Sequence, residues 1–161
     1  MTIAYIGLGS NVGERQEFCR KALEALRAAP GIDVQATSSL YETAPIGGPP
    51  QRSYINAVVR VRTDLNPHGL LKQCKAIEQQ LGREPSDIKW GPRVVDLDVL
   101  TYGDVKLSDP ELEIPHPQMT QRRFVLVPLL EIDPEATDPW GTRYADSLDT
   151  AEGEVELLEP L

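Results

Sequence analysis

Residues 53–63 read Ser-Tyr-Ile-Asn-Ala-Val-Val-Arg-Val-Arg-Thr, and this stretch carries the clearest strand pattern in the chain. Successive side chains of a β-strand point to opposite faces of a sheet. One predicted face therefore carries four aliphatic side chains, those of Ile55, Ala57, Val59 and Val61. The other face carries Tyr54, Asn56, Val58 and Arg60. The pattern predicts a strand with one wholly apolar face and one face that presents an aromatic ring beside an amide.

Helix and strand patterns alternate on both sides of this strand. Downstream, a helix is predicted from Asn66-Pro67 to Gly82, followed by a strand over 94–102. Upstream, strands are predicted over 3–8 and 32–41, with a helix between them. The order strand, helix, strand, strand, helix, strand is typical of ferredoxin-like α+β folds. We therefore expect an antiparallel sheet with helices packed on it.

Two long polar loops interrupt the pattern. Residues 42–52 contain two Gly and three Pro, and residues 83–92 contain Trp90. Long loops in compact domains are usually functional, so we expect both to be mobile catalytic loops that meet over one edge or end of the sheet. A small hairpin is predicted from 104–107 onward, and a helix over 122–132 that Pro128 disturbs.

Charge and composition exclude several classes of protein. The chain has 161 residues, with 16 Lys and Arg against 25 Asp and Glu, a net charge of −9. A general nucleic-acid binder needs a basic surface, so we expect no nucleic-acid partner. No run of residues approaches a membrane span, and the first residues do not resemble a secretory signal. We therefore expect a cytoplasmic protein without a membrane partner, with Cys19 and Cys74 as reduced core thiols.

The negative charge is concentrated at the C-terminal end. From Asp133 to Leu161 the net charge is −8, whereas the first 132 residues have a net charge of −1. This distribution predicts one domain over residues 1–138, followed by an acidic C-terminal tail (139–161). We expect the C-terminal tail to be solvated and not to form an independent domain.

Asp96 and Asp98 are the first candidates for chemistry. They alternate with Val95, Leu97 and Val99, which places both carboxylates on one face of the predicted strand. Oxygen ligands of this kind suit Mg²⁺, and arginines at 83, 93, 122 and 123 suit phosphate oxygens. The alternative is a solvated face of an edge strand.

The glycine-rich run 7–13 lies between a predicted strand and a predicted helix. A dinucleotide-binding fingerprint would need glycine at Val12, and a P-loop would need lysine where Glu14 follows Gly13. We therefore interpret the run as a tight strand-to-helix turn, which disfavours a nucleotide-binding oxidoreductase.

A longer motif resembles a known family. Residues 89–100, Lys-Trp-Gly-Pro-Arg-Val-Val-Asp-Leu-Asp-Val-Leu, are similar to the signature of the 6-hydroxymethyl-7,8-dihydropterin pyrophosphokinases. Further matches lie at 5–11, 54–57 and 114–117, in the order that the family has them. The resemblance runs from the start of the chain to about Glu131.

This resemblance implies a ferredoxin-like α+β domain that acts in tetrahydrofolate biosynthesis. Such an enzyme transfers the diphosphoryl group of ATP to a pterin hydroxymethyl oxygen and releases AMP. Its cofactor would be Mg²⁺, two ions held by Asp96 and Asp98, and its partners would be the two small-molecule substrates of a monomer. The implied catalytic residues are Arg83, Arg93, Asp96 and Asp98. The implied ATP-binding residues are Glu78, Arg83, Trp90, Arg93, His116 and Arg122. The implied pterin-binding residues are Thr43, Pro45, Ile46, Tyr54, Asn56, Trp90 and Phe124.

The chain also departs from the family pattern. Pro85, Ser86 and Asp87 stand where some members carry basic residues, and Pro117 replaces a tyrosine seen in some relatives. The rival interpretation from another class is a non-catalytic ferredoxin-like ligand-binding module. Such a module would not need Asp96, Asp98 and Arg93 together, so their joint presence favours the enzyme.

Overall fold

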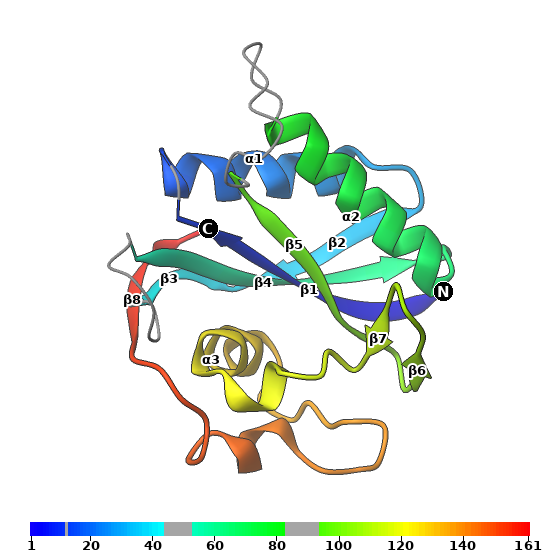
Figure 1. The fold of residues 1–161 in the computed structure, drawn as a ribbon, viewed down its shortest axis with the longest axis vertical. Helices are drawn as coiled ribbons and strands as arrows, with labels where there is room; N and C mark the ends of the chain where they lie inside the picture. The colour runs from blue at the N-terminus through cyan, green and yellow to red at the C-terminus, as the bar shows by residue number, and fades with distance from the viewer. Residues whose placement is uncertain (12, 44–52, 83–93) are drawn as a thin grey trace.

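The strand identified first from the sequence lies in the middle of a six-stranded antiparallel sheet (Figure 1). The computed structural model describes residues 1–11, 13–43, 53–82 and 94–161. Its strands are β1 (Thr2–Ser10), β2 (Ile32–Thr37), β3 (Ser39–Thr43), β4 (Tyr54–Thr63), β5 (Asp96–Tyr102), β6 (Leu107–Ser108), β7 (Glu113–Ile114) and β8 (Val155–Pro160). Its α-helices are α1 (Arg15–Ala28), α2 (Pro67–Gly82) and α3 (Arg123–Ile132).

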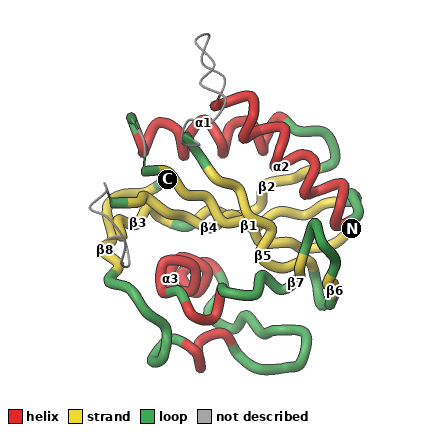
Figure 2. Tube along the Cα trace, in the orientation of Figure 1, coloured by secondary structure: helices red, strands yellow, loops and turns green. Residues whose placement is uncertain are grey.

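The order of strands in the sheet is β5-β1-β4-β3-β8, and β2 also pairs with β4. Helices α1 and α2 cover one face of this sheet, and α3 lies on the other (Figures 1 and 2). The predicted antiparallel, ferredoxin-like α+β fold is confirmed. The predicted hairpin is also present, as the pair β6–β7.

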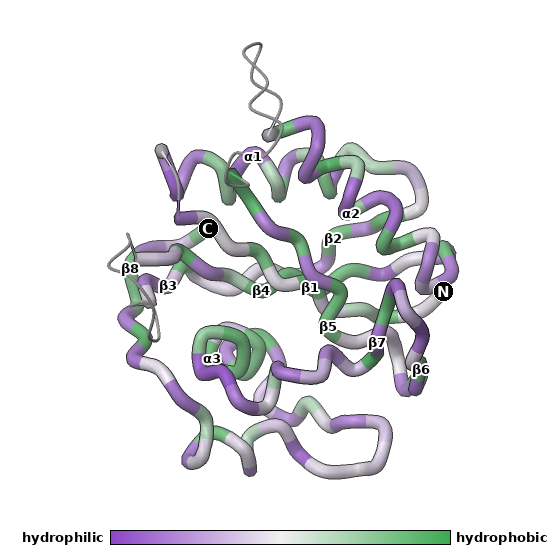
Figure 3. The backbone as a smooth tube through the Cα atoms, viewed as in Figure 1, coloured by the Kyte–Doolittle hydropathy of each residue, from purple (hydrophilic) through white to green (hydrophobic). Residues whose placement is uncertain are grey.

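Both faces of β4 are buried, and each packs against a different layer. Val59 lies in one apolar cluster with Leu26 of α1 and Leu70 of α2. Val58, on the opposite face, lies in a second cluster with Leu126 of α3. Helix α3 is mostly hydrophobic along its length, whereas α1 and α2 alternate in hydropathy (Figure 3). The strand therefore needs both layers to keep its aliphatic side chains from water.

The single strand predicted over 32–41 is two strands. At the break, Ser38 donates its backbone N–H to the Val58 carbonyl (2.9 Å), and its hydroxyl accepts the Val58 N–H (2.8 Å). The hydroxyl thus takes the place of a backbone carbonyl, and the chain bends while the pairing with β4 continues. The prediction of one strand was wrong because the hydropathy pattern does not show where a serine hydroxyl replaces a backbone hydrogen-bond acceptor.

The expectation of a solvated C-terminal tail (139–161) is wrong. Tyr144 and Ala151 are 2% and 6% exposed and lie in the apolar cluster beneath α3. Further along, β8 pairs with β3 in the main sheet, and Glu159 forms an ion pair with Arg20 of α1 (2.6 Å). The charge count could not indicate these contacts, because most of the acidic side chains of the tail are exposed, whereas its backbone and apolar side chains pack against the rest of the domain. The division of the chain at residue 138 stays a prediction.

Two of the expectations about chain segments fall largely outside the described residues. The expected catalytic loops cover 42–52 and 83–92, of which the structure describes only residues 42 and 43.

Among the described residues, no helix combines the length and the apolar character that a membrane span requires.

We predict that both cysteine thiols are inert in the folded protein. Cys19 and Cys74 are free and buried, and burial raises the pKa of each thiol to about 12. The thiolate is the reactive form, so iodoacetamide in mildly alkaline buffer should modify neither residue in the native chain and both in denaturant. Mass spectrometry of the alkylated chain gives the count. Rapid labelling of either thiol in the native protein would contradict the buried placement.

Candidate active site

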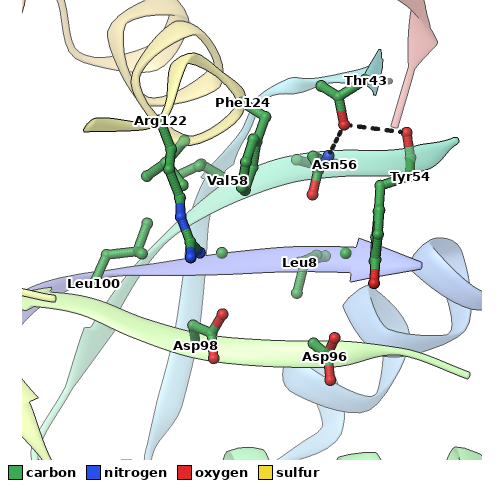
Figure 4. A pocket seen from close by; sticks show the side chains of 14 residues that line it. Leu8, Thr43, Tyr54, Asn56, Val58, Asp96, Asp98, Leu100, Arg122 and Phe124 are labelled. Atoms are coloured by element: carbon green, nitrogen blue, oxygen red, sulfur yellow. Dashed lines mark hydrogen bonds between the residues drawn. The ribbon is translucent and has the colours of Figure 1, made fainter. Parts of the chain in front are cut away.

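A pocket of about 340 Å³ opens on the face of the sheet that carries α3. Its walls come from four strands and from the start of α3, so segments distant in sequence meet there (Figure 4). The lining residues are Gly7, Leu8, Gly9, Thr43, Tyr54, Asn56, Ala57, Val58, Asp96, Asp98, Leu100, Arg122, Phe124 and Val125. All of the described residues that the family resemblance implies for metal and pterin binding are in this set.

Glycines of β1 form part of the pocket floor. A Cβ atom at Gly9 would lie 3.0 Å from Asn56 Oδ1, and one at Gly7 would lie 3.5 Å from the Leu100 side chain. The absence of a side chain at Gly9 therefore allows Asn56 to lie against β1. The sequence interpretation of this run as a turn is wrong at Gly9, because β1 continues beyond its predicted end at residue 8 to Ser10. Residues 5, 7 and 9 of one strand point to the same face of the sheet, so the period-two pattern that starts at Tyr5 was the signal that could have placed both glycines on the α3 face.

The amide of Asn56 is oriented by a short chain of hydrogen bonds. Asn56 Nδ2 donates to Thr43 Oγ1 (2.7 Å), and the Thr43 hydroxyl donates to the Tyr54 carbonyl (3.5 Å). Thr43 and Asn56 are 4% and 7% exposed. Because the Nδ2 side is held by Thr43, Asn56 Oδ1 points away from Thr43 and towards β1 (Figure 4). The Asn56 amide therefore presents one fixed edge to the pocket, beside the Tyr54 ring.

Asp96 and Asp98 lie on the same side of β5 and both line the pocket (Figure 4). Leu97 between them points into the core and is 1% exposed. Its backbone N–H donates to Glu78 Oε2 (2.8 Å), so the carboxylate of α2 fixes β5 at the residue between the two acids. The prediction that the two carboxylates share a face is borne out by this geometry.

Glu78 lies elsewhere than the pocket lining. It is 8% exposed, and its second carboxylate oxygen is 3.3 Å from Lys75 Nζ. The structure thus shows a structural role for a residue that the resemblance assigns to nucleotide binding. The nucleotide role of Glu78 stays a prediction.

Arg122 reaches from the start of α3 towards β1 (Figure 4). Its guanidinium carbon lies 5.4 Å from the centre of the Phe124 ring, a cation–π contact, and its Nη2 donates to Gln118 Oε1. The ring and the guanidinium therefore support each other at the pocket wall.

His116 lies within electrostatic range of both Asp98 and Arg122. Burial lowers the pKa of His116, the Asp98 charge opposes this shift, and the Arg122 charge adds to it. Nδ1 accepts the Gln118 N–H (3.2 Å), so neutral His116 carries its proton on Nε2. The side chain is thus a neutral hydrogen-bond donor at neutral pH.

Arg15 is a residue near the site that sequence reasoning missed. Its Nη1 lies 3.1 Å from Glu42 Oε2 and donates to the Ser53 carbonyl (2.8 Å). Glu42 is next to Thr43, the last residue of β3, and Ser53 directly precedes Tyr54, the first residue of β4. Arg15 therefore ties together the two strand ends that carry Thr43 and Tyr54. A charged residue at a helix start has no distinctive pattern, so the sequence alone held no signal for this contact.

Several predicted site residues lie outside the described residues, namely Pro45, Ile46, Arg83, Trp90 and Arg93. Within residues 1–11, 13–43, 53–82 and 94–161, no group of three or more His, Cys, Asp or Glu side chains is arranged to hold a metal ion. Among the described residues, Asp96 and Asp98 are the acidic side chains that line the pocket.

Comparison with known proteins identifies the relatives of this chain. The sequence model of the family described as 7,8-dihydro-6-hydroxymethylpterin-pyrophosphokinase (HPPK) matches residues 5–134. The 2-amino-4-hydroxy-6-hydroxymethyldihydropteridine pyrophosphokinase of Methylorubrum extorquens is 49% identical over 135 residues, covering 84% of this chain and 85% of the relative. The Bacillus subtilis protein of the same name is 43% identical over 130 residues, covering 81% of this chain and 77% of the relative.

Solved structures support the fold. The crystal structure of Plasmodium falciparum wild-type HPPK-DHPS superposes with a TM-score of 0.69 at 16% identity. The match covers 92% of this chain but 43% of that longer chain. A second HPPK-DHPS structure, in complex with substrates, gives a TM-score of 0.72 at 13% identity, with 92% and 43% coverage.

We predict that the Thr43 hydroxyl is needed to orient Asn56. Thr43→Val keeps the shape of the side chain but removes the acceptor of the Asn56 Nδ2 hydrogen bond. One such bond contributes about 1 kcal/mol, so the Kd for 6-hydroxymethyl-7,8-dihydropterin should rise roughly fivefold. Thr43→Ser retains the hydroxyl and is the matched control, expected to stay close to the parent protein. Calorimetric titration compares the three proteins, and equal affinities for Val and Ser would rule out the orienting role.

Proposed function

Because this chain belongs to the 7,8-dihydro-6-hydroxymethylpterin-pyrophosphokinase family, we propose that it transfers a diphosphoryl group from ATP to 6-hydroxymethyl-7,8-dihydropterin. The pterin hydroxymethyl oxygen forms a bond to the β-phosphorus of ATP. The bond from that phosphorus to the oxygen bridging the α-phosphate breaks, AMP leaves, and the hydroxyl proton is released. The observation that carries the proposal is one pocket that unites Tyr54, Asn56 and Phe124 with Asp96 and Asp98.

The pterin end of the pocket suits a flat, amide-rich heterocycle. Tyr54 and Phe124 offer ring faces for stacking, and such ring contacts contribute about 1 kcal/mol each beyond the area they bury. Asn56, oriented by Thr43, offers an acceptor and a donor on one edge. A pterin ring has complementary groups along one edge, so stacking and edge recognition act together. Holding the pterin, the substrate that receives the diphosphoryl group, in one orientation reduces the entropic part of the activation barrier.

The carboxylates of Asp96 and Asp98 suit Mg²⁺. Mg²⁺ is bound through one or two carboxylates and completes its shell with water and substrate phosphates, which fits two oxygen ligands on one strand face. We propose two ions, held by these residues together with ATP. When bound, Mg²⁺ supplies charge stabilisation at the phosphate oxygens. The role of the chain is to hold both carboxylates in place, and the Glu78 contact with the Leu97 N–H serves this purpose.

Arg122 and His116 are proposed to contact the phosphates. The planar guanidinium of Arg122 matches phosphate oxygens. His116 presents a neutral Nε2–H donor, as the Gln118 N–H occupies Nδ1. Loose phosphoryl-type transfer needs charge stabilisation more than a strong base, so these donors are the groups that the reaction requires.

The family uses ATP as a co-substrate and acts on small molecules. A monomer that works in the cytoplasm, without nucleic-acid or membrane partners, completes the proposal. The acidic chain, with its net charge of −9, supports the exclusion of nucleic acid.

The test of the reaction is AMP formation from ATP, Mg²⁺ and 6-hydroxymethyl-7,8-dihydropterin. Asp96→Asn and Asp98→Asn should each lower kcat by at least about a hundredfold, roughly 2.7 kcal/mol of transition-state stabilisation, while a thermal melt shows an intact fold. Asp104→Asn is the matched control, because Asp104 is exposed in the turn after β5. Turnover near the parent value in both pocket variants would exclude the metal assignment, and no AMP from the parent protein would exclude the reaction.

The two ring residues should differ in which ligand they affect. Tyr54→Ala should raise the Kd for the pterin about tenfold and leave a non-cleavable ATP analogue unaffected, since one stacking face and its buried area are lost. Phe124→Ala should weaken both ligands, because Arg122 rests on the Phe124 ring. Phe18→Ala, at the other phenylalanine of the chain, is the control. Calorimetry with each ligand separately decides, and a Tyr54→Ala protein that loses both affinities equally would indicate a core role for Tyr54.

A further inference from the structure

The C-terminal tail (139–161) contacts the pocket wall through its backbone. Glu152 donates its N–H to the Gln121 carbonyl (2.9 Å) and accepts the Arg123 N–H on its own carbonyl (3.0 Å). These two hydrogen bonds flank Arg122 on either side and make a parallel bridge between Arg122 and Glu152. The residue that reaches into the pocket is therefore fixed by a segment 30 positions further along the chain.

The bridge also completes the start of α3. The first N–H groups of a helix lack partners within the helix, and Arg122, the N-cap residue, makes no side-chain cap hydrogen bond. The Glu152 carbonyl accepts the N–H of the first helical residue, Arg123, and so takes over part of the capping. Arg122 stays in extended backbone conformation (φ −125°, ψ 112°). Without the bridge, the first turn of α3 would be free to fray and Arg122 to change direction.

The position of Glu152 is itself fixed. Its neighbour Ala151 is 6% exposed, and Tyr144, earlier in the C-terminal tail, is 2% exposed against the same cluster as Leu126. Arg123 Nε also donates to the Leu148 carbonyl (3.2 Å). The Glu152 side chain is exposed, so its charge plays no part in the bridge.

The same segment reaches the opposite wall of the pocket. Strand β8 pairs with β3, and Val155 lies opposite Thr43, the residue that orients Asn56. The C-terminal tail therefore contacts both the Arg122 wall and the Thr43 wall.

We propose that the C-terminal tail is a positioning element of the active site, with the Glu152 backbone bridge setting the direction of Arg122 towards the substrate phosphates. This inference rests on the proposed function. The family match ends at residue 134, so the bridge lies in a part of the chain beyond that match. Glu152 acts through Arg122 and contacts no substrate itself.

Glu152→Pro removes the N–H that bonds to Gln121, whereas Glu152→Ala keeps it and removes only the exposed carboxylate. With Mg²⁺ and α,β-methylene-ATP, which cannot be cleaved at the reacting bond, Glu152→Pro should raise the Kd tenfold or more. Glu152→Ala should stay within twofold of the parent protein. The pterin Kd should change much less than the ATP-analogue Kd in Glu152→Pro, a difference that a general loss of stability would not produce.

A pair of glycine variants keeps the test decisive if Glu152→Pro does not fold. Gly153 (φ +106°) and Gly141 (φ +91°) both lie in the C-terminal tail with backbone angles that strain any other residue. Gly153 adjoins the bridge, whereas a Cβ at Gly141 has nothing within 4 Å. Gly153→Ala should weaken the ATP analogue about threefold, and Gly141→Ala should leave it unchanged.

The final comparison introduces Glu152→Pro, or Gly153→Ala if Glu152→Pro does not fold, into an Arg122→Ala protein. If the bridge acts through Arg122, this added substitution should cause no further loss of ATP-analogue affinity. An equal loss in that background, unchanged affinity in both Glu152→Pro and Gly153→Ala, or equal weakening of pterin and ATP analogue would overturn the proposal. AMP release by the parent protein tests the proposed function separately, because the affinity comparisons do not depend on turnover.

Discussion

The burial of β4 on both faces is the constraint on which the rest of the structure depends. Val59 faces α1 and α2, and Val58 faces α3, so two separate layers must be recruited to one strand. Helix α3 covers only part of its face. Where it stops, the same strand presents Tyr54 and Asn56 to an open pocket. The site is therefore the uncovered end of the second core layer, and the helix that closes that layer supplies Arg122 and Phe124 at its first turn.

Polar groups in this arrangement are held by partners from other elements. The buried Asn56 amide depends on Thr43 of β3, and the edge strand β5 depends on Glu78 of α2 for the N–H of Leu97. An unsatisfied buried polar group costs about 1–3 kcal/mol, so each of these pairs favours one geometry strongly over its alternatives. These hydrogen bonds hold the Asn56 amide and the β5 backbone between Asp96 and Asp98 in place.

The sequence predicted those parts of the fold and site that depend on local alternation. Period-two patterns placed Tyr54 with Asn56, and Asp96 with Asp98, on shared faces, and the order of elements predicted the antiparallel sheet. What it could not predict depends on contacts between distant segments. The Ser38 break, the Arg15 contact with Glu42 and Ser53, and the Glu152 bridge each involve hydrogen bonds that hydropathy does not record. In the C-terminal tail, charge composition pointed to solvent while the backbone packed against α3.

In this chain of net charge −9, the acidic C-terminal tail adjoins a pocket that is proposed to bind ATP, a polyanion, and its backbone and side chains act differently there. Glu152, Glu154 and Glu156 are exposed, and Glu159 is paired with Arg20. Exposed charges are screened over a Debye length of about 8 Å at physiological ionic strength, so their effect on a bound phosphate is weak. The Glu152 backbone, in contrast, bonds to both neighbours of Arg122. An acidic segment can therefore hold the cationic side chain of Arg122 in place, since the part of the segment that makes contact is neutral.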